Sequence, residues 1–148
     1  MSADPAPLAF VDTNIFVYAS AGDDTVRAPI AQQLLDQLMA TQALATSTQV
    51  LQELFVTLTR KGDRRLRAEE VLRILDRITK FRVFMVGYAA IREAAELSGR
   101  DAFSFWDALI LVAAARSGAT RLYTEDLQHG RTVLGVEIVN PFRRARRS

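Results

Sequence analysis

The chain has 148 residues, of which 49% are hydrophobic and 24% are charged, and it contains no cysteine. This length and composition are typical of a single globular domain and argue against a disordered chain. The absence of cysteine excludes a disulfide framework, a thiol nucleophile and a cysteine-bound metal, and it fits a reducing compartment.

The net charge of +2 depends on the end of the chain. Four arginines there contribute +4, so the remainder carries −2; they are Arg143, Arg144, Arg146 and Arg147. Such a basic tail either attracts a polyanion such as nucleic acid or is simply a solvated terminus.

The sequence has no pattern that is typical of a secreted or a membrane-spanning protein. The first seven residues lack the positive start and apolar core of a signal peptide. The most apolar stretch, Phe105 to Ala115, contains Asp107 and is too short to span a bilayer. We therefore expect a soluble, cytoplasmic protein with no membrane partner.

The first predicted element is a strand over residues 8–11. Its short, uninterrupted apolar run indicates a strand covered on both faces, in the interior of a parallel sheet. Asp12 follows at the carboxyl end of that strand, where open α/β sheets bind their ligands. The alternative interpretation is that Asp12 or Thr13 only caps the next helix, over residues 15–19.

The middle of the chain alternates between helical and strand patterns. Apolar spacing predicts a helix over 28–39, a short strand over 43–46, and a helix that Ser47 or Thr48 caps. Glu53 flanks the apolar stripe of this third helix, so its carboxylate either leans over the rim of the sheet or is an ordinary solvated side chain. A further helix covers 71–78, a third strand 81–86 and another helix 88–97.

The last third begins with a helix that is apolar on all sides through Ala115. Ser104 gives it a start that resembles a capping box, and Asp107 is its only ionisable residue, which predicts a buried helix. A fourth strand over 121–124, a loop over 125–130 and a fifth strand over 136–139 complete the pattern. Strands that alternate with helices predict an α/β fold with a parallel sheet.

Four carboxylates are expected at one edge of this sheet. Strand C-termini and the N-termini of the helices that follow share a rim. Asp107 reaches that rim only if residues 98–104 bring the chain back to it. Crowded carboxylates need a neutralising cation, and Mg²⁺ or Mn²⁺ prefers oxygen ligands. Helix N-termini at the same rim favour a phosphate group, so the site suits phosphodiester chemistry. The acids are Asp12, Glu53, Asp107 and Asp126.

An ordered set of motifs resembles the signature of PIN-domain ribonucleases, and most closely the VapC-type toxins of bacterial toxin–antitoxin pairs. Each motif alone has low specificity, but together and in this order they cover nearly the whole chain. They are Asp12-Thr13-Asn14, Gln49-Val50-Leu51-Gln52-Glu53, Phe105-Trp106-Asp107-Ala108-Leu109-Ile110, the stretch from Tyr123 to Gly130, and Asn140-Pro141-Phe142.

The resemblance implies a single PIN domain over residues 1–148, with its core at about 8–142 and residues 143–148 as a basic tail. The implied fold is a three-layer α/β/α sandwich whose five parallel strands have the order 3-2-1-4-5. The implied activity is a Mg²⁺- or Mn²⁺-dependent endoribonuclease that hydrolyses phosphodiester bonds in transfer or ribosomal RNA. Such toxins are homodimers, and a VapB-type antitoxin inhibits them.

The same resemblance assigns roles to individual residues. Asp12, Glu53 and Asp107 match the metal-binding acids, and Asp126 matches a more variable fourth acid. Three neighbours match polar positions that orient the acids or a water molecule; they are Thr13, Asn14 and Thr124.

Two further candidates lie in the loop after the fourth strand. Glu125 is next to Asp126, and the sequence alone allows the two to exchange roles. His129 is the only histidine, but it does not match a catalytic position of the family, so we interpret it as a loop residue.

Two other classes remain possible from the sequence. A receiver-like phosphoacceptor domain would need a lysine after a late strand, whereas the only lysines are Lys61 and Lys80. A PIN-fold module that binds RNA or protein without catalysis is the second; retention of all four acids argues against it.

Overall fold

The structure is a computed structural model that describes residues 6–60 and 66–143. Its centre is a six-stranded sheet with the order β3-β2-β1-β4-β6-β5. All neighbouring strands are parallel except β5 and β6, which are antiparallel. The strands are β1 (Ala9–Val11), β2 (Leu44–Ser47), β3 (Arg82–Phe84), β4 (Arg121–Tyr123), β5 (Thr132–Val133) and β6 (Val136–Val139).

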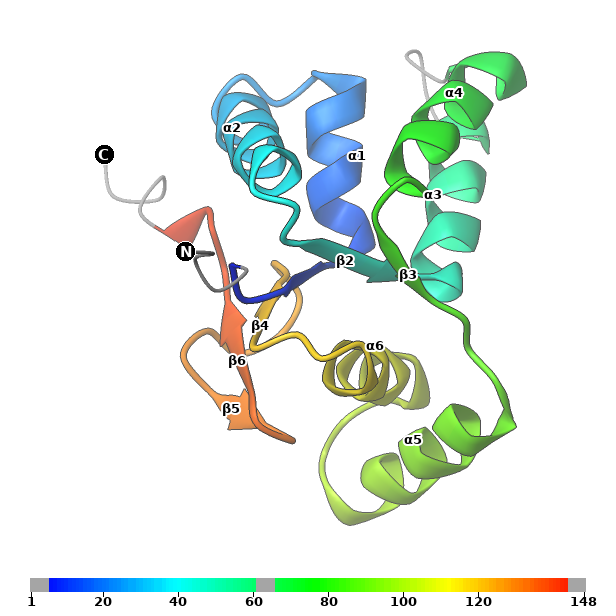
Figure 1. The fold of residues 1–148 in the computed structure, drawn as a ribbon, viewed down its shortest axis with the longest axis vertical. Helices are drawn as coiled ribbons and strands as arrows, with labels where there is room; N and C mark the ends of the chain where they lie inside the picture. Colours follow the sequence, from blue (N-terminus) through cyan, green and yellow to red (C-terminus); the bar gives the residue numbers. More distant parts are fainter. Residues whose placement is uncertain (1–5, 61–65, 144–148) are drawn as a thin grey trace, which may run out of the picture.

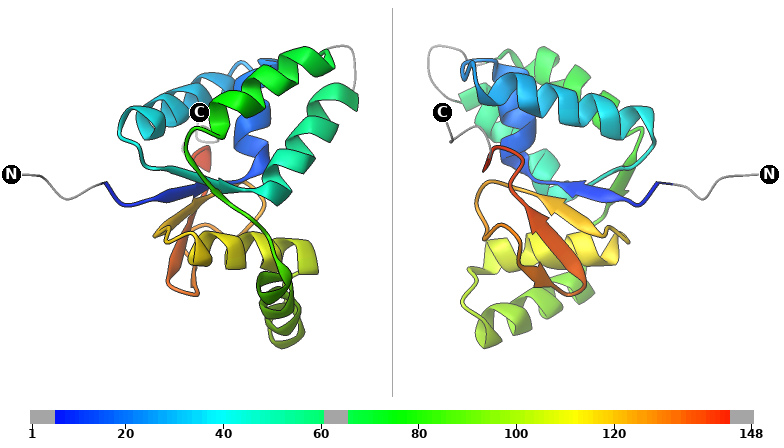
Figure 2. Two further views of the ribbon diagram at one scale, coloured as in Figure 1. Left: turned by 45° about the vertical axis from the view of Figure 1, so that its right-hand side comes forward. Right: turned by 90° about the vertical axis from the view of Figure 1, so that its left-hand side faces the viewer.

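Helices cover both faces of the sheet, as Figures 1 and 2 show. One face carries α1 (Thr13–Ala21), α2 (Arg27–Ala40), α3 (Thr48–Arg60) and α4 (Ala68–Ile78). The other face carries α5 (Tyr88–Arg100) and α6 (Phe105–Arg116), which pack against each other. The predicted three-layer α/β/α sandwich is therefore confirmed.

The sheet has one strand more than predicted. The strand expected over 136–139 is β6, and it occupies the fifth place in the order, as predicted. The prediction missed β5, which has only two residues and pairs antiparallel with β6. The turn between them has φ of 53° at Leu134 and 78° at Gly135. Positive φ at both positions is the geometry of a tight hairpin, but Leu-Gly lacks the Asn or Asp that usually signals it.

The core explains why the site lies at one edge. β1 is buried along its whole length, and Phe10 and Val11 have no exposed surface. Seven consecutive residues of α6, Ala108 to Ala114, are buried, which confirms the prediction that this apolar helix is buried. Because β1 runs parallel to β2 and β4, the carboxyl ends of the central strands lie at the same edge.

The two ends of the predicted domain are only partly described. Arg143 is exposed, while Arg144, Arg146 and Arg147 of the basic tail lie outside the described residues. Within residues 6–60 and 66–143, none of the helices has the length and apolar character needed to cross a membrane.

Candidate active site

Asp12 is a buried acid at the carboxyl end of β1, with 7% of its surface exposed. Its Oδ1 accepts a hydrogen bond of 2.7 Å from the backbone N–H of Thr13, so it caps α1. Its Oδ2 accepts a bond of 2.8 Å from the hydroxyl of Thr124, which follows β4. Asp12 therefore caps a helix, as one interpretation predicted, and its other oxygen meets a residue that follows the neighbouring strand.

Glu53 reaches the same edge from the second turn of α3. Its Oε1 accepts a hydrogen bond of 2.7 Å from the hydroxyl of Thr13. Its Oε2 accepts a longer bond of 3.3 Å from the side-chain amide of Gln49, one helical turn earlier. Glu53 is half-buried and is not the freely solvated side chain of the alternative interpretation.

Asp126 joins the group from the loop after β4. Its Oδ2 accepts a hydrogen bond of 3.0 Å from the side-chain amide of Asn14, and its backbone N–H donates to the Thr124 hydroxyl at 3.1 Å. Consecutive residues at the start of α1 thus contact all three acids. The three residues that the resemblance implied as supporting each hydrogen-bond one of these acids; they are Thr13, Asn14 and Thr124.

Burial and charge change the chemistry of Asp12. Its pKa rises from 3.8 to about 6, chiefly because burial disfavours the charged carboxylate. The nearby negative charges of Asp126 and Glu53 raise the pKa further, while the hydrogen bonds from Thr13 and Thr124 oppose the rise. A positive charge placed beside this carboxylate would therefore stabilise the ionised form.

Asp107 lies at the third position of α6, where its backbone N–H donates to the capping hydroxyl of Ser104 at 3.1 Å. The carboxylate itself makes no hydrogen bond or ion pair with another described residue. The start of α6 is beside α3, because the amide of Gln49 also contacts the backbone carbonyl of Trp106 at 3.5 Å. After residues 101–104 the chain thus returns to the part of α3 that carries Gln49 and Glu53. We call the predicted rim, with Asp12, Glu53, Asp107 and Asp126, the acid edge.

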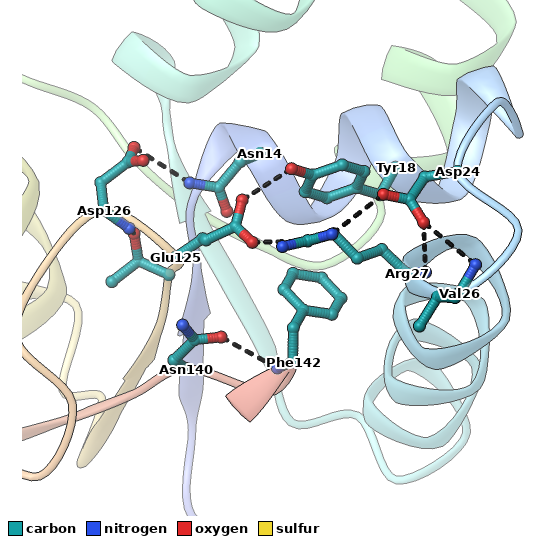
Figure 3. A network of polar contacts seen from close by, with 10 residues as sticks. Asn14, Tyr18, Asp24, Val26, Arg27, Glu125, Asp126, Asn140 and Phe142 are labelled. Atoms are coloured by element: carbon teal, nitrogen blue, oxygen red, sulfur yellow. Dashed lines mark hydrogen bonds and ion pairs between the residues drawn. The ribbon is translucent and has the colours of Figure 1, made fainter. Parts of the chain in front are cut away.

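Glu125 belongs to a different network, which Figure 3 shows. Its two carboxylate oxygens accept hydrogen bonds of 2.6 Å from the Tyr18 hydroxyl and from Nε of Arg27. The guanidinium of Arg27 in turn lies 5.5 Å from the ring centroid of Tyr18 and 5.7 Å from that of Phe142. Asp126 instead contacts Asn14, so the two neighbouring acids have separate environments. The sequence could not make this distinction, because Arg27 is 98 residues away.

His129 has a structural contact in the same loop. Its Nδ1 accepts a hydrogen bond of 3.0 Å from the backbone N–H of Asn140, just after β6. This bond holds the loop against the end of β6. It agrees with the interpretation of His129 as a loop residue.

The residues at the acid edge have the chemistry of a hard-cation site. Two buried side-chain oxygens in the described part of the chain lack a hydrogen-bond partner, Oδ1 of Asn14 and Oε1 of Gln49. Each belongs to an amide that already contacts one of the acids. Unsatisfied buried oxygens of this kind are typically completed by water or an ion. As the side chains lie, no three acids of the described residues converge on one metal position, so the acids would have to turn to share an ion.

Sequence reasoning did not assign a role to Gln49. It links Glu53 with the start of α6, and its spacing of four residues from Glu53 was visible in the sequence. The second contact, to the carbonyl of Trp106, is 57 residues away and had no local signal.

The fold is an α/β domain in which Asp12, Glu53 and Asp126 are linked through the first residues of α1. The chain belongs to the PIN domain family, because the family model described as "PIN domain" matches residues 9–133. No curated protein matches the chain. Family membership confirms the PIN-domain resemblance and removes the receiver-like alternative.

Solved structures of toxins have the same fold. A toxin–antitoxin complex from Klebsiella pneumoniae has a TM-score of 0.67 and 20% identity, covering 90% of this chain and 97% of that chain. VapC20 of Mycobacterium tuberculosis, described as a toxin that cleaves the sarcin–ricin loop, has a TM-score of 0.62 and 25% identity, covering 80% and 91%. VapBC2 of Rickettsia felis, bound to a DNA fragment from its promoter, has a TM-score of 0.62 and 20% identity, and the match covers 88% of this chain and 96% of that chain.

Proposed function

We propose that this protein is a metal-dependent endoribonuclease toxin that a cognate VapB-type antitoxin neutralises. The observation that carries the proposal is the contact of Asp12, Glu53 and Asp126 with consecutive residues at the start of α1. The likeness to VapC20, a toxin that cleaves the sarcin–ricin loop, supports RNA as the substrate. The expected substrates are transfer or ribosomal RNA, which fits the cytoplasmic location predicted from the sequence.

The acids Asp12, Glu53, Asp107 and Asp126 would hold Mg²⁺ or Mn²⁺. Such an ion supplies a Lewis acid that lowers the pKa of a water molecule and neutralises charge on the phosphoryl oxygens.

Neighbouring side chains hydrogen-bond three of these acids. The hydroxyls of Thr124 and Thr13 orient one oxygen each of Asp12 and Glu53. The amide of Asn14 orients Asp126. These bonds set the orientation of the carboxylates before an ion binds, and some of them would have to change as the acids turn toward a shared ion.

The test is incubation of the purified protein with total RNA in Mg²⁺, in Mn²⁺ and in EDTA. We expect cleavage only with a divalent ion, and no cleavage by Asp12→Asn or Asp107→Asn, whose circular dichroism spectra should match that of the wild type. If the wild type leaves RNA intact with either metal, the protein is instead a PIN-fold module that binds RNA or protein without catalysis. For an active enzyme, sequencing of 5′ ends after induced expression would identify the cleavage site.

The proposed partners are an antitoxin and a second copy of the chain. Complexes of similar toxins with their antitoxins support the first. A pocket of about 390 Å³ between α1, α2 and α4 offers apolar contact surface; it includes Phe16, Leu35, Met39 and Ile74. Light scattering would test the homodimer, and loss of RNA cleavage on adding the protein encoded beside this one would test the antitoxin.

A further inference from the structure

Trp106 is the only tryptophan of the chain and is 62% exposed. It is the second residue of α6 and directly precedes Asp107 at the acid edge. Exposure of so large an aromatic side chain costs free energy that burial would recover, so its position in the solvent needs an explanation. Among the described residues, the aromatic contact of its ring is with Phe105, and most of the side chain stays exposed.

The ring is exposed but firmly positioned. The Phe105 ring packs edge-on against it, with the centroids 5.1 Å apart and an interplanar angle of 78°. Phe105 itself packs against the core. The cap of α6 by Ser104 fixes the backbone at this point.

Trp106 is also tied to the acids through one side chain. The amide of Gln49 contacts both the carbonyl of Trp106 and Oε2 of Glu53. Trp106 and Asp107 are consecutive, so they project about 100° apart around the helix axis. The ring is therefore not on the side of α6 opposite Asp107.

An acidic site has particular need of such a residue. Where no ion neutralises them, four carboxylates repel the phosphates of a nucleic acid, so binding there gains from a contact that does not depend on charge. Stacking of a base on an aromatic ring does not depend on charge, and loss of one such ring weakens binding by roughly 5- to 150-fold.

We propose that Trp106 stacks on a base of a single-stranded RNA whose backbone lies along the acid edge. The inference rests on the proposed function, since it names how that site holds its substrate. Trp106 is thereby a substrate-binding residue, adjacent to the acids and separate from them in role.

The single tryptophan makes the contact directly measurable. We would titrate full-length Asp12→Asn protein, in which cleavage is disabled, with a short unstructured RNA and follow tryptophan fluorescence. We expect saturable quenching that persists at raised salt, because stacking is less sensitive to salt than phosphate contacts. An RNA of the same length with abasic residues should cause little quenching.

Variants separate the ring from its surroundings. By anisotropy of labelled RNA, Trp106→Ala should bind roughly 5- to 150-fold more weakly, and Trp106→Phe should keep most of the affinity. Leu72→Ala is the matched control, because Leu72 is a 52% exposed apolar residue on α4, across the sheet. It should bind RNA as the parent does, and melting curves should show that all variants are folded.

Several results would overturn the inference. The first is equal affinity of the Trp106→Ala variant and its parent for RNA, and the second is the absence of RNA binding. The third is tryptophan fluorescence that changes on protein dilution but not with RNA, which would assign Trp106 to contact with a second copy. Failure of the proposed function gives a different pattern. Trp106-dependent binding without cleavage by the wild type leaves this inference standing, whereas RNA cleavage that Trp106→Ala leaves unchanged removes the inference alone.

Discussion

The hydroxyl of Thr124 donates a hydrogen bond of 2.8 Å to the carboxylate of Asp12, although the two residues are 112 positions apart in the sequence. Both side chains are buried, and the two residues directly follow the central, neighbouring strands β4 and β1. The same hydroxyl accepts a bond from the backbone N–H of Asp126. Thr124 therefore joins two of the proposed metal ligands through one oxygen atom.

Thr124→Val should destabilise the protein because it removes this oxygen without changing the shape of the side chain much. Oδ2 of Asp12 and the N–H of Asp126 then lose their partner, at a cost of about 1–3 kcal/mol in the free energy of unfolding. Chemical denaturation in EDTA measures the loss. Thr124→Ser keeps the hydroxyl and should lose less than half as much; equal unfolding midpoints for wild type and Thr124→Val would contradict the account.

The raised pKa of Asp12 predicts an unusual pH dependence of stability in the absence of metal. The native protein binds the proton more tightly than the unfolded chain, since the pKa is about 6 in the fold against 3.8 for a freely solvated aspartate. The stability contributed by Asp12 is therefore greatest below about pH 4 and is lost as the pH rises through about 6, by up to ~3 kcal/mol.

Asp12→Asn should remove most of this dependence. In EDTA, the variant should be more stable than the wild type at about pH 8 and similar to it only at about pH 4 or below, where Asp12 is protonated in both the folded and the unfolded chain. Denaturation curves at the two pH values test this, and Asp76→Asn, at an exposed position on α4, serves as the control. The prediction is contradicted if the free energy of unfolding of the wild type rises relative to that of Asp12→Asn as the pH rises.

Loss of charge at Glu125 should lower stability, whereas loss of charge at Asp126 should weaken metal binding. Glu125→Gln breaks the ion pair with Arg27, in which the side chains are only 16% and 26% exposed. We expect it to lower the free energy of unfolding by about 1–3 kcal/mol and to leave Mn²⁺ affinity nearly unchanged. Asp126→Asn should keep stability but weaken Mn²⁺ binding at least about tenfold. Calorimetric titration with Mn²⁺ separates the two, and the reverse pattern would make Glu125 the ligand.

His129→Ala should have a small effect, because its ring bonds to the backbone of Asn140 at the surface, where water can replace it. RNA cleavage should stay within about threefold of the wild type, with an unchanged pH profile. Loss of a general acid or base typically costs about 10²–10⁴-fold. A loss of that size, without a loss of stability, would make His129 catalytic.

Much of this fold follows from local pattern. The apolar run before Asp12 predicted a buried central strand, and the helix from Phe105 was recognised as buried because it has apolar residues on every side. The sequence did not predict β5, because a strand of two residues is too short to show any periodicity. Its turn also depends on positive φ at Leu134, where a Leu gives no signal.

The candidate site was predictable as a set of positions but not as a set of contacts. The rules that govern connections between strands and helices predict Asp12, Glu53 and Asp126 at one rim from the sequence alone, whereas Asp107 needed the further assumption that residues 98–104 return the chain to that rim. Those rules cannot say which of two adjacent acids faces that rim. The ion pair of Glu125 with Arg27 gives the two acids different partners, and it depends on the packing of α2 against α1.

The most direct test is Mn²⁺ binding by the wild-type protein, followed by electron paramagnetic resonance and by the melting temperature in Mn²⁺ against EDTA. We predict saturable binding and a higher melting temperature with Mn²⁺, both lost in Asp12→Asn and Asp107→Asn and kept in Asp76→Asn. If Mn²⁺ neither binds the wild type nor shifts its melting temperature, or if Asp107→Asn binds it unchanged, the four acids do not form one cation site.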